Sequence, residues 1–295
     1  MRHYLGVDAG GTFTRFVLFD ESGKQVERHV IDSIHFMKIG FDGIQNQLNQ
    51  VKKHFESLNY NFDHIDVVIG MAGYGKDQTI RDNIEKAVWA VYPHAILMND
   101  AQIAMISALD NQDGVYVISG TGSIAFRKLG CVEDRRGGFG YLLGDEGSAF
   151  WIGRQLLALF TKQSDGRLPQ GGFYREVMSH FELTSPYDLI GIANGQKDEY
   201  RNWVAQLSGL ASKFTDEPEV HHVFKQAGLE LAELANNFEL EAQTNIAVGG
   251  GVLKHNEIVR NTFIDNLKSD FTLVDNKQPV EYTAFILCAK SSNIG

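Results

Sequence analysis

The sequence has little cysteine, little proline and no long apolar run, and each shortage excludes a class of protein. The two cysteines, Cys131 and Cys288, lie far apart, so neither a disulfide framework nor a zinc knuckle is expected. Five prolines and the absence of low-complexity runs argue against long disordered linkers. No window is apolar enough to cross a bilayer, and residues 1–9 lack the pattern of a signal peptide. These features predict a cytoplasmic protein.

Positive charge is also in short supply. Lysine and arginine number 27 against 37 aspartates and glutamates, which gives a net charge of −10 and a pI near 5.5. A field of that sign repels nucleic acid and anionic membranes, so neither is an expected partner. A nucleotide is still compatible with it, because backbone N–H groups and a metal ion can hold phosphates locally. The 295 residues, 43% of them hydrophobic, suffice for two domains with separate cores.

Strands and glycine-rich turns open the chain. Residues 4–7 are apolar and β-prone, residues 8–12 form a turn, and residues 13–19 resume the strand. In Walker and Rossmann phosphate loops the glycines lead into a helix, so a second strand after the glycines disfavours both classes. A second hairpin of the same design begins at Val115. We interpret it as a degenerate internal repeat, with a boundary near residues 111–114.

The remaining segments alternate between helix and strand patterns, as in an α/β protein. The stretch from Leu183 to Lys197 shows no clear pattern. Helices are expected over residues 41–58, 82–91, 101–109, 149–160, 256–267 and 282–290, and further strands over 25–31, 65–71, 95–98 and 244–248. The helix over 149–160 is almost wholly apolar and is expected to be buried.

The two hairpin turns are the first candidates for chemistry. Glycines let a backbone approach phosphate oxygens closely, and Asp8 at the strand end suits a Mg²⁺ ion held through water. Each turn alone could equally be an ordinary hairpin whose glycines supply positive φ. The pairing of two such turns favours a shared polyphosphate site. Their sequences are Asp8-Ala9-Gly10-Gly11-Thr12-Phe13-Thr14 and Ser119-Gly120-Thr121-Gly122-Ser123.

Two carboxylates and a third glycine turn complete the set. Asp100 at a strand end is suited to accept a proton from a substrate hydroxyl, although an Asp before a helix is usually an N-cap. Asp145, between glycines and ahead of the apolar helix, is suited to bind sugar hydroxyls or to cap that helix. The Gly249-Gly250-Gly251 turn gives flat access for adenosine, but a strand-to-helix turn would look similar.

In chain order these motifs resemble the N-acetylglucosamine kinase branch of the BadF/BadG/BcrA/BcrD ATPases, within the actin and hexokinase superfamily. The most specific part of the resemblance runs from Gly137 to Ile152. The resemblance implies an α/β fold of two ribonuclease-H-like, actin-like ATPase domains flanking a central cleft. We assign the domains to residues 1–113 and 114–295, with the last helix a candidate to pack back on the N-terminal domain. The matching stretches are residues 8–12, 99–101, 119–123, 137–140 with 144–148, and 249–251.

The resemblance also implies a role for each motif in an ATP- and Mg²⁺-dependent sugar kinase. Asp100 is expected to be the general base toward the sugar 6-hydroxyl, and Asp8 the metal ligand. The ATP phosphates are assigned to Gly10, Gly11, Thr12, Thr14, Gly120, Thr121 and Gly122, and adenosine to Gly249, Gly250 and Gly251. The sugar is assigned to His35, Asp100, Ser123, Gly138, Phe139, Asp145 and Ala149.

Some alternatives remain open at this stage. Animal members often carry Asn in the loop after the third strand, whereas this chain has Ser33-Ile34-His35-Phe36, so the substituent at C2 is not fixed. N-acetylglucosamine is the expected substrate, with glucosamine and muramic-type sugars as alternatives. An ATPase module for a partner protein and a non-catalytic sensor are rival classes. A homodimer is expected.

Overall fold

The computed structural model describes residues 2–75, 77–130, 132–275 and 278–290, without the side chains of Asp198 and Lys290. Cys131, one of the two cysteines considered above, lies outside the described residues. The chain divides into two compact units, residues 1–112 with 275–295, and residues 113–274. The sequence predicted domains over residues 1–113 and 114–295, with the last helix a candidate to pack on the first domain. The last segment instead belongs to the first unit. No helix in the described ranges combines the length and apolarity needed to cross a membrane.

The first unit is built on a mixed sheet with the strand order β3-β2-β1-β4-β5. Antiparallel pairing joins β1, β2 and β3 in sequence, while β1, β4 and β5 run parallel. The strands are β1 His3–Ala9, β2 Phe13–Phe19, β3 Gln25–Asp32, β4 Ile65–Met71 and β5 Ile96–Asn99. The helices are α1 Phe36–Ser57, η1 Phe62–His64, α2 Gln78–Trp89, α3 Asp100–Leu109, η4 Val280–Tyr282, α11 Thr283–Phe285 and η5 Ile286–Lys290.

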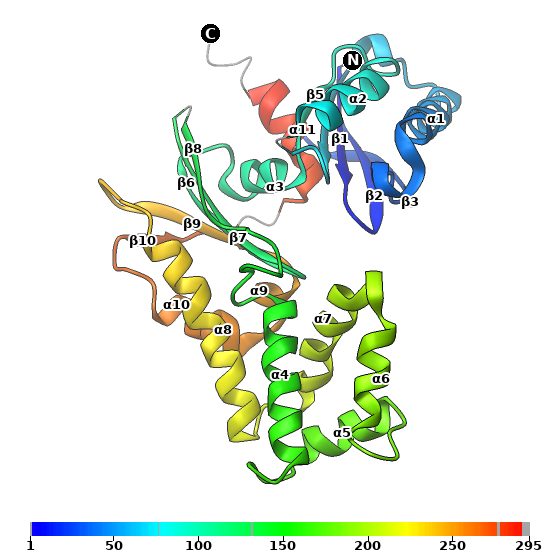
Figure 1. Cartoon of the computed structure of the whole chain (residues 1–295). Helices are drawn as coiled ribbons and strands as arrows, with labels where there is room; N and C mark the ends of the chain where they lie inside the picture. Colours follow the sequence, from blue (N-terminus) through cyan, green and yellow to red (C-terminus); the bar gives the residue numbers. More distant parts are fainter. Residues whose placement is uncertain (1, 76, 131, 276–277, 291–295) are drawn as a thin grey trace. The chain divides into compact units, whose positions relative to one another are not determined.

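Helices cover both faces of this sheet, with α1 and α2 on one side and α3 and α11 on the other (Figure 1). The apolar positions of α1 recur every three to four residues, so Ile44, Leu48 and Phe55 all point into the core. On the opposite face, Ile103 of α3 and Ala284 of α11 pack against the sheet. The sheet is therefore buried on both sides, which explains the continuous apolar run of β4.

The second unit repeats this plan with the strand order β10-β9-β6-β7-β8. Its first three strands are antiparallel, and β6, β9 and β10 are parallel, so β6 corresponds to β1 and β9 to β4. The predicted internal repeat is confirmed. The strands are β6 Gly114–Ser119, β7 Ser123–Leu129, β8 Val132–Gly137, β9 Thr244–Gly249 and β10 Phe271–Leu273. The helices are α4 Ala149–Ser164, α5 Gly172–His180, α6 Asp188–Gly195, η2 Lys197–Glu199, α7 Tyr200–Ala211, η3 Ser212–Phe214, α8 Pro218–Asn236, α9 Gly251–His255 and α10 Glu257–Asp265.

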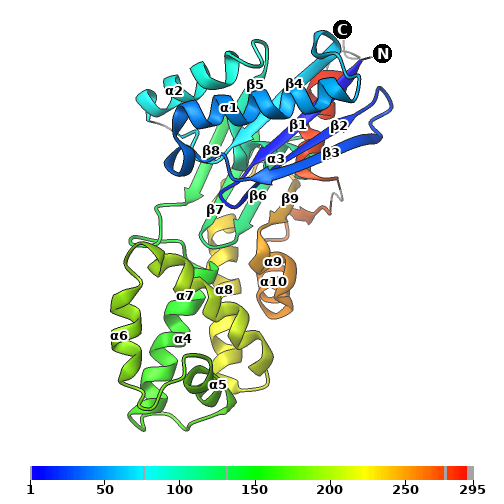
Figure 2. The same ribbon diagram turned by 90° about the vertical axis from the view of Figure 1, so that its right-hand side faces the viewer.

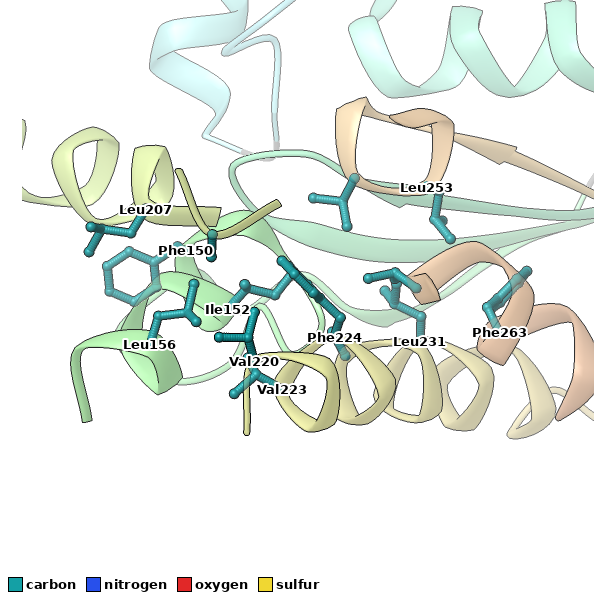
Figure 3. Close-up of a cluster of buried hydrophobic side chains, with 14 of the residues drawn as sticks. Phe150, Ile152, Leu156, Leu207, Val220, Val223, Phe224, Leu231, Leu253 and Phe263 are labelled. Carbon is teal, nitrogen blue, oxygen red and sulfur yellow. The ribbon is translucent and has the colours of Figure 1, made fainter. Parts of the chain in front are cut away.

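A layer of helices packs around α4 in this unit. Figure 2 shows α4, α5, α6 and α7 grouped beside one another, and Figure 3 shows side chains of α4 and α8 meeting in one apolar cluster. Phe150, Ile152 and Leu156 of α4 are buried there, whereas Arg154 and Gln155 on the same helix are exposed. The helix expected to be buried over 149–160 is therefore buried along one face, and Arg154 and Gln155 lie on its exposed face.

The close packing of Gly6 against the C-terminal segment generates a test of the fold. A Cβ at Gly6, in the middle of β1, would overlap the backbone carbonyl of Glu281. We expect Gly6→Ala to lower the free energy of unfolding by about 1–3 kcal/mol, as overpacking of a core does. Urea unfolding followed by circular dichroism measures this. Gly75→Ala is the matched control, because nothing lies closer than 4.0 Å to a Cβ there. Equal stability of the two variants would contradict the packing of Glu281 on β1.

Candidate functional site

The turn between β1 and β2 is held from outside and leaves its tip exposed. The Ser33 hydroxyl donates to the carbonyl of Gly10 at 2.8 Å, and the Lys38 ammonium donates to the carbonyl of Gly11 at 2.7 Å. Gly11 and Thr12 are exposed at the tip. Ser33 and Lys38 come from the segment after β3, which therefore fixes the shape of the turn. Lys38 could not be recognised from the sequence, since a lysine at the start of a helix carries no local signal.

Thr14 and His35, both expected to contact ligands, have local partners in the structure. Thr14 is fully buried, and its hydroxyl oxygen accepts the N–H of Ile34 at 3.2 Å. His35 caps α1 through Nδ1, which accepts the N–H of Met37 at 3.2 Å, and its ring stacks on Phe36. Burial lowers the pKa of His35, with the charge of a nearby lysine acting in the same direction. Both side chains therefore support the loop, and His35 is a neutral imidazole near pH 7.

Asp100 lies at the carboxyl end of β5, in the first turn of α3. The helix is capped by Asn99, whose side chain accepts the N–H of Ala101 at 2.9 Å in a capping box with Gln102. The interpretation of Asp100 as the N-cap was therefore wrong, since the residue before it performs that role. Burial raises the pKa of Asp100, although the N–H of Ala101 donates to its carboxylate at 3.0 Å and acts in the opposite direction. Desolvation outweighs this hydrogen bond.

Asp8 lies at the carboxyl end of β1, on the same edge of the sheet as Asp100. Strands β1, β4 and β5 are parallel, so their carboxyl ends meet at that edge. Arg15 of β2 pairs with Asp8 at 3.0 Å. Burial raises the pKa of Asp8, the Arg15 charge opposes this rise, and the Asp100 charge adds to it. The two carboxylates are thus close enough to sense each other.

The donor chemistry of this edge fits a magnesium ion. Mg²⁺ prefers oxygen ligands, keeps several waters, and is usually bound through one or two carboxylates together with substrate phosphates. Asp8 and Asp100 supply carboxylates, and the exposed turn at Gly11 lies at the end of the same strand as Asp8. In the described residues no group of three or more His, Cys, Asp or Glu is placed to hold a metal. The arrangement suits an ion shared with phosphates more than a site made of protein ligands.

In the second unit, the turn between β6 and β7 is tied to the start of α4. The N–H of Gly120 donates to the carbonyl of Gly122 at 2.9 Å. The N–H groups of Ala149 and Phe150 donate to the carbonyls of Gly120 and Thr121 at 2.8 and 3.3 Å. The first donors of α4 are therefore used to fix this turn. Ala149, expected beside the sugar, is part of that junction.

The three-glycine turn after β9 packs directly on the turn between β6 and β7. Gly250 has φ of 84°, in the left-handed region that favours glycine, and a Cβ there would overlap the carbonyl of Ser119. A Cβ at Gly249 would overlap the Tyr116 hydroxyl, whereas one at Gly251 meets nothing within 4 Å. Glycine is thus required at two of the three positions. The expected adenosine turn and the expected second phosphate turn are neighbours.

Both hairpin tips present backbone donors. Within the described part of the chain, no hydrogen bond engages the N–H of Gly11 or Thr12 at the first tip. The same holds in that part of the chain for Thr121 and Gly122 at the second tip. Successive N–H groups in a turn form concavities that bind anions. The chain therefore carries such a turn in each unit.

Asp145 is buried and held by a residue that the sequence analysis did not single out. Arg201 of α7 pairs with it at 3.1 Å, and Asp145 has φ of 61°, which is uncommon for a non-glycine residue. A Cβ at Gly122 would lie 2.5 Å from a guanidinium nitrogen of Arg201 and 2.6 Å from a carboxylate oxygen of Asp145. The Ser123 hydroxyl donates to the carbonyl of Glu146 at 2.6 Å. The carboxylate of Asp145 thus lies directly beside the second turn, and Ser123 holds the loop in place.

The loop before Asp145 includes the other two residues expected near the sugar. Gly138 has φ of 68° and packs so tightly on Ile124 of β7 that a Cβ would overlap that side chain. The next side chain, Phe139, is 68% exposed, with the Arg135 guanidinium 6.0 Å from its ring centre. Gly138 therefore fixes the path of the loop, and Phe139 offers an open aromatic face.

These features define a class of protein. Two units with the same strand order, each with a glycine-rich hairpin turn at the carboxyl edge of its sheet, form the duplicated α/β fold of the actin-like ATPase superfamily. The predicted fold class is confirmed by a solved structure of a proposed N-acetylglucosamine kinase from Chromobacterium violaceum. It matches with a TM-score of 0.77 at 21% identity, and covers 97% of this chain and 99% of that one.

The particular family follows from the sequence. The model of the BadF/BadG/BcrA/BcrD ATPase family matches residues 5–284, and the chain belongs to this family. The N-acetyl-D-glucosamine kinase of Dictyostelium discoideum is 30% identical over 223 residues, which cover 70% of this chain and 69% of that protein. The N-acetylmuramic acid/N-acetylglucosamine kinase of Clostridium acetobutylicum is 26% identical over 195 residues, covering 64% and 63%. The predicted membership is confirmed.

The proximity of Asp8 and Asp100 generates a test by titration. Replacing Asp100 with Asn removes a negative charge that raises the pKa of Asp8, so we expect the Asp8 pKa to fall. Replacing Arg15 with Gln removes a positive charge and should raise it. The carboxyl ¹³C chemical shift of Asp8, followed against pH, measures both changes. Asp63→Asn, which precedes β4 at the other edge of the sheet, is the control. If the pKa of Asp8 does not change in Asp100→Asn, the two carboxylates do not interact electrostatically.

Proposed function

We propose that this protein is a kinase that transfers the γ-phosphoryl group of Mg·ATP to an amino sugar, with N-acetylglucosamine as substrate and its 6-hydroxyl as acceptor. The names of the relatives support phosphorylation of an amino sugar. The observation that carries the proposal is Asp100, a buried carboxylate at the sheet edge that also bears the first glycine turn. This is the placement that a general base for phosphoryl transfer to an alcohol requires.

Asp100 acts on the sugar hydroxyl in this proposal. Its carboxylate accepts a hydrogen bond from the hydroxyl, orients the oxygen toward the γ-phosphorus, and takes the proton as the new P–O bond forms. The pKa of Asp100, raised by burial, brings its proton affinity closer to that of a base that works near neutral pH. Asn99 contributes by capping α3, so the carboxylate of Asp100 is not needed as the N-cap of that helix.

The two glycine turns bind the phosphates. The N–H groups of Gly11 and Thr12 in one unit, and of Thr121 and Gly122 in the other, donate to the polyphosphate as charge shifts during transfer. Asp8 would hold Mg²⁺, which would supply positive charge beside the phosphate oxygens. Adenosine lies beside the second turn at Gly251, where a Cβ would meet nothing within 4 Å, and the close packing of Gly249 and Gly250 fixes the shape of that turn.

Asp145 binds sugar hydroxyls. A carboxylate accepts two hydrogen bonds from neighbouring hydroxyls, and the ion pair with Arg201 fixes the orientation of Asp145. Gly138, Phe139 and Ala149 line the region of the 2-substituent. Thr14, Ser123 and His35 hold loops through their side chains, and their contacts with phosphate or sugar stay predictions. The homodimer and the cytoplasmic location expected from the sequence stay predictions.

Asp100→Asn tests the role of the base. We expect kcat for N-acetylglucosamine to fall on the order of 10²–10⁴-fold, because the amide orients the hydroxyl but cannot take its proton. The Kd for the sugar, measured by isothermal titration calorimetry, should change little. Asp63→Asn, at the other edge of the same sheet, serves as the control for replacing a carboxylate. A near-normal rate in Asp100→Asn would exclude Asp100 as the base.

The products test the reaction itself. A kinase forms ADP and sugar phosphate in equal amounts, whereas an ATPase module forms ADP and free phosphate. Coupled ADP detection together with ³¹P NMR of the reaction mixture measures both, and proton–phosphorus correlation assigns the phosphorylated carbon. Sugar-stimulated release of free phosphate without a sugar phosphate would overturn the proposal in favour of an ATPase.

A further inference from the structure

The guanidinium of Arg201 keeps hydrogen-bond donors beyond the one that pairs with Asp145. A guanidinium carries several N–H donors in a fixed plane and has no acceptor. Nη2 of Arg201 donates to Asp145 at 3.1 Å, whereas the buried Nε has no hydrogen-bond acceptor within the described part of the chain. A buried donor without an acceptor is costly, and a bound anion is one way of supplying the acceptor. Arg201 therefore has a donor left for a ligand.

The packing of α7 on α4 places Arg201 beside the second glycine turn. The two helices lie side by side (Figure 2), and the ring of Tyr200 at the start of α7 meets Phe150 at the start of α4 edge to face at 6.3 Å. The N–H of Phe150 in turn donates to the carbonyl of Thr121. A Cβ at Gly122 would lie 2.5 Å from Nη2 of Arg201. The guanidinium therefore lies against the turn whose tip offers backbone N–H groups.

The described carboxylates near Arg201, in space or in sequence, belong to Asp145, Glu146 and Glu199. Asp145 pairs with the guanidinium, so this pair carries no net charge. Glu146 lines a separate cavity, where its charge acts on Glu230. Glu199 accepts a hydrogen bond from a side chain of α7 at 3.1 Å. The attraction for an anion at the turn therefore comes from free donors of the guanidinium and the backbone, not from a net positive charge.

We propose that Arg201 binds the polyphosphate of the nucleotide together with the tip of the second turn. Its guanidinium donates to phosphate oxygens that the N–H groups of Thr121 and Gly122 also hold, and it keeps its contact with Asp145. A planar guanidinium and successive backbone N–H groups are both suited to the oxygens of a phosphate. This inference rests on the proposed kinase function, in which Arg201 so far only orients Asp145.

The same guanidinium links the two substrates of the proposed reaction. A Cβ at Gly122 would lie 2.6 Å from the carboxylate of Asp145, so the proposed sugar-binding carboxylate and the proposed phosphate-binding turn are neighbours. A rigid cation that contacts both fixes their separation. During transfer, negative charge spreads over the phosphoryl oxygens, and a cation held in place beforehand stabilises it.

Nucleotide binding measures the contact without turnover. Calorimetric titrations with ATP and with AMP, each with Mg²⁺ and without sugar, compare the wild-type protein with Arg201→Gln. We expect the Kd for ATP to rise about tenfold, because a charged hydrogen bond to phosphate is lost, and the Kd for AMP to change much less. Arg167→Gln, which removes an exposed arginine paired with Asp165 at the end of α4, should change neither. An unchanged Kd for ATP, or equal changes for both nucleotides, would overturn the inference.

Asp145→Asn separates a direct role of Arg201 from a role through Asp145. If Arg201 acted solely by orienting that carboxylate, Arg201→Gln and Asp145→Asn would both weaken N-acetylglucosamine binding and leave ATP binding unchanged. We expect instead that Asp145→Asn weakens sugar binding but not ATP binding, because it removes a negative charge near the phosphates and keeps the guanidinium. Arg201→Lys keeps the charge without the planar fork, and should retain part of the ATP affinity that Arg201→Gln loses.

These measurements keep the inference distinct from the kinase proposal. If ATP binding depends on Arg201 but no sugar phosphate forms, the kinase proposal fails and the role of Arg201 stands. If N-acetylglucosamine is phosphorylated while Arg201→Gln binds ATP as the wild-type protein does, the role of Arg201 fails and the kinase proposal stands. Circular dichroism of Arg201→Gln, expected to match that of the wild-type protein, tests whether weaker binding reflects unfolding. Were this variant unfolded, Arg201→Lys would supply the same comparison.

Discussion

Parallel pairing of the first and fourth strands of each unit, β1 with β4 and β6 with β9, is the constraint on which the rest of the structure depends. It aligns the carboxyl ends of these strands with the hairpin turn that follows the first one. In the first unit this brings Asp8, the turn at Gly11 and, through β5, Asp100 to one edge. In the second unit it packs Gly250 against the turn at Gly120. The pairing of the strands alone thus makes candidate site residues that are distant in sequence neighbours in space.

The buried carboxylates in the two units are stabilised in different ways. Buried carboxylates are costly unless they are paired, and the two units meet that cost in different ways. Asp145 has a guanidinium partner in Arg201. Burial raises the pKa of Asp8, the charge of Arg15 opposes this rise, and the charge of Asp100 adds to it. An added cation at the first edge would offset the like charges of Asp8 and Asp100, whereas Asp145 already has a cationic partner.

Much of this could be predicted from the sequence. The strand–turn–strand pattern excluded helix-opening phosphate loops, and the two hairpins predicted the duplicated sheet. The strand β8, Val132–Gly137, was missed because its edge position lets it carry the charged sequence Val-Glu-Asp-Arg-Arg-Gly. Helix α6 was missed because its start depends on Asp188, whose carboxylate accepts the N–H groups of Thr184 and Ser185. In the sequence alone, a segment held by such hydrogen bonds looks like an ordinary polar loop.

The site residues divide along the same line. Asp100, Asp145 and the glycine turns have local signatures, namely a strand end or a run of glycines. Arg201 has none, because a single arginine in an amphipathic helix looks like a surface residue. Only the folding of α7 beside the loop at Asp145 brings Arg201 to its partner. The spacing of residues in the sequence does not show which way a side chain points. It therefore could not show that the hydroxyls of Thr14 and Ser123 bind their own loops.

The C-terminal segment has a consequence for the order in which the chain can mature. Residues 280–285 supply part of the cover for one face of the first sheet, packing on Gly6 and beside Ile103. A ribosome makes these residues after the whole second unit. The first-made sheet therefore waits with one face only partly covered, by α3, until the second unit has been made. A nascent chain of this kind depends on its helix α3, or on a chaperone, to shield that face during the delay.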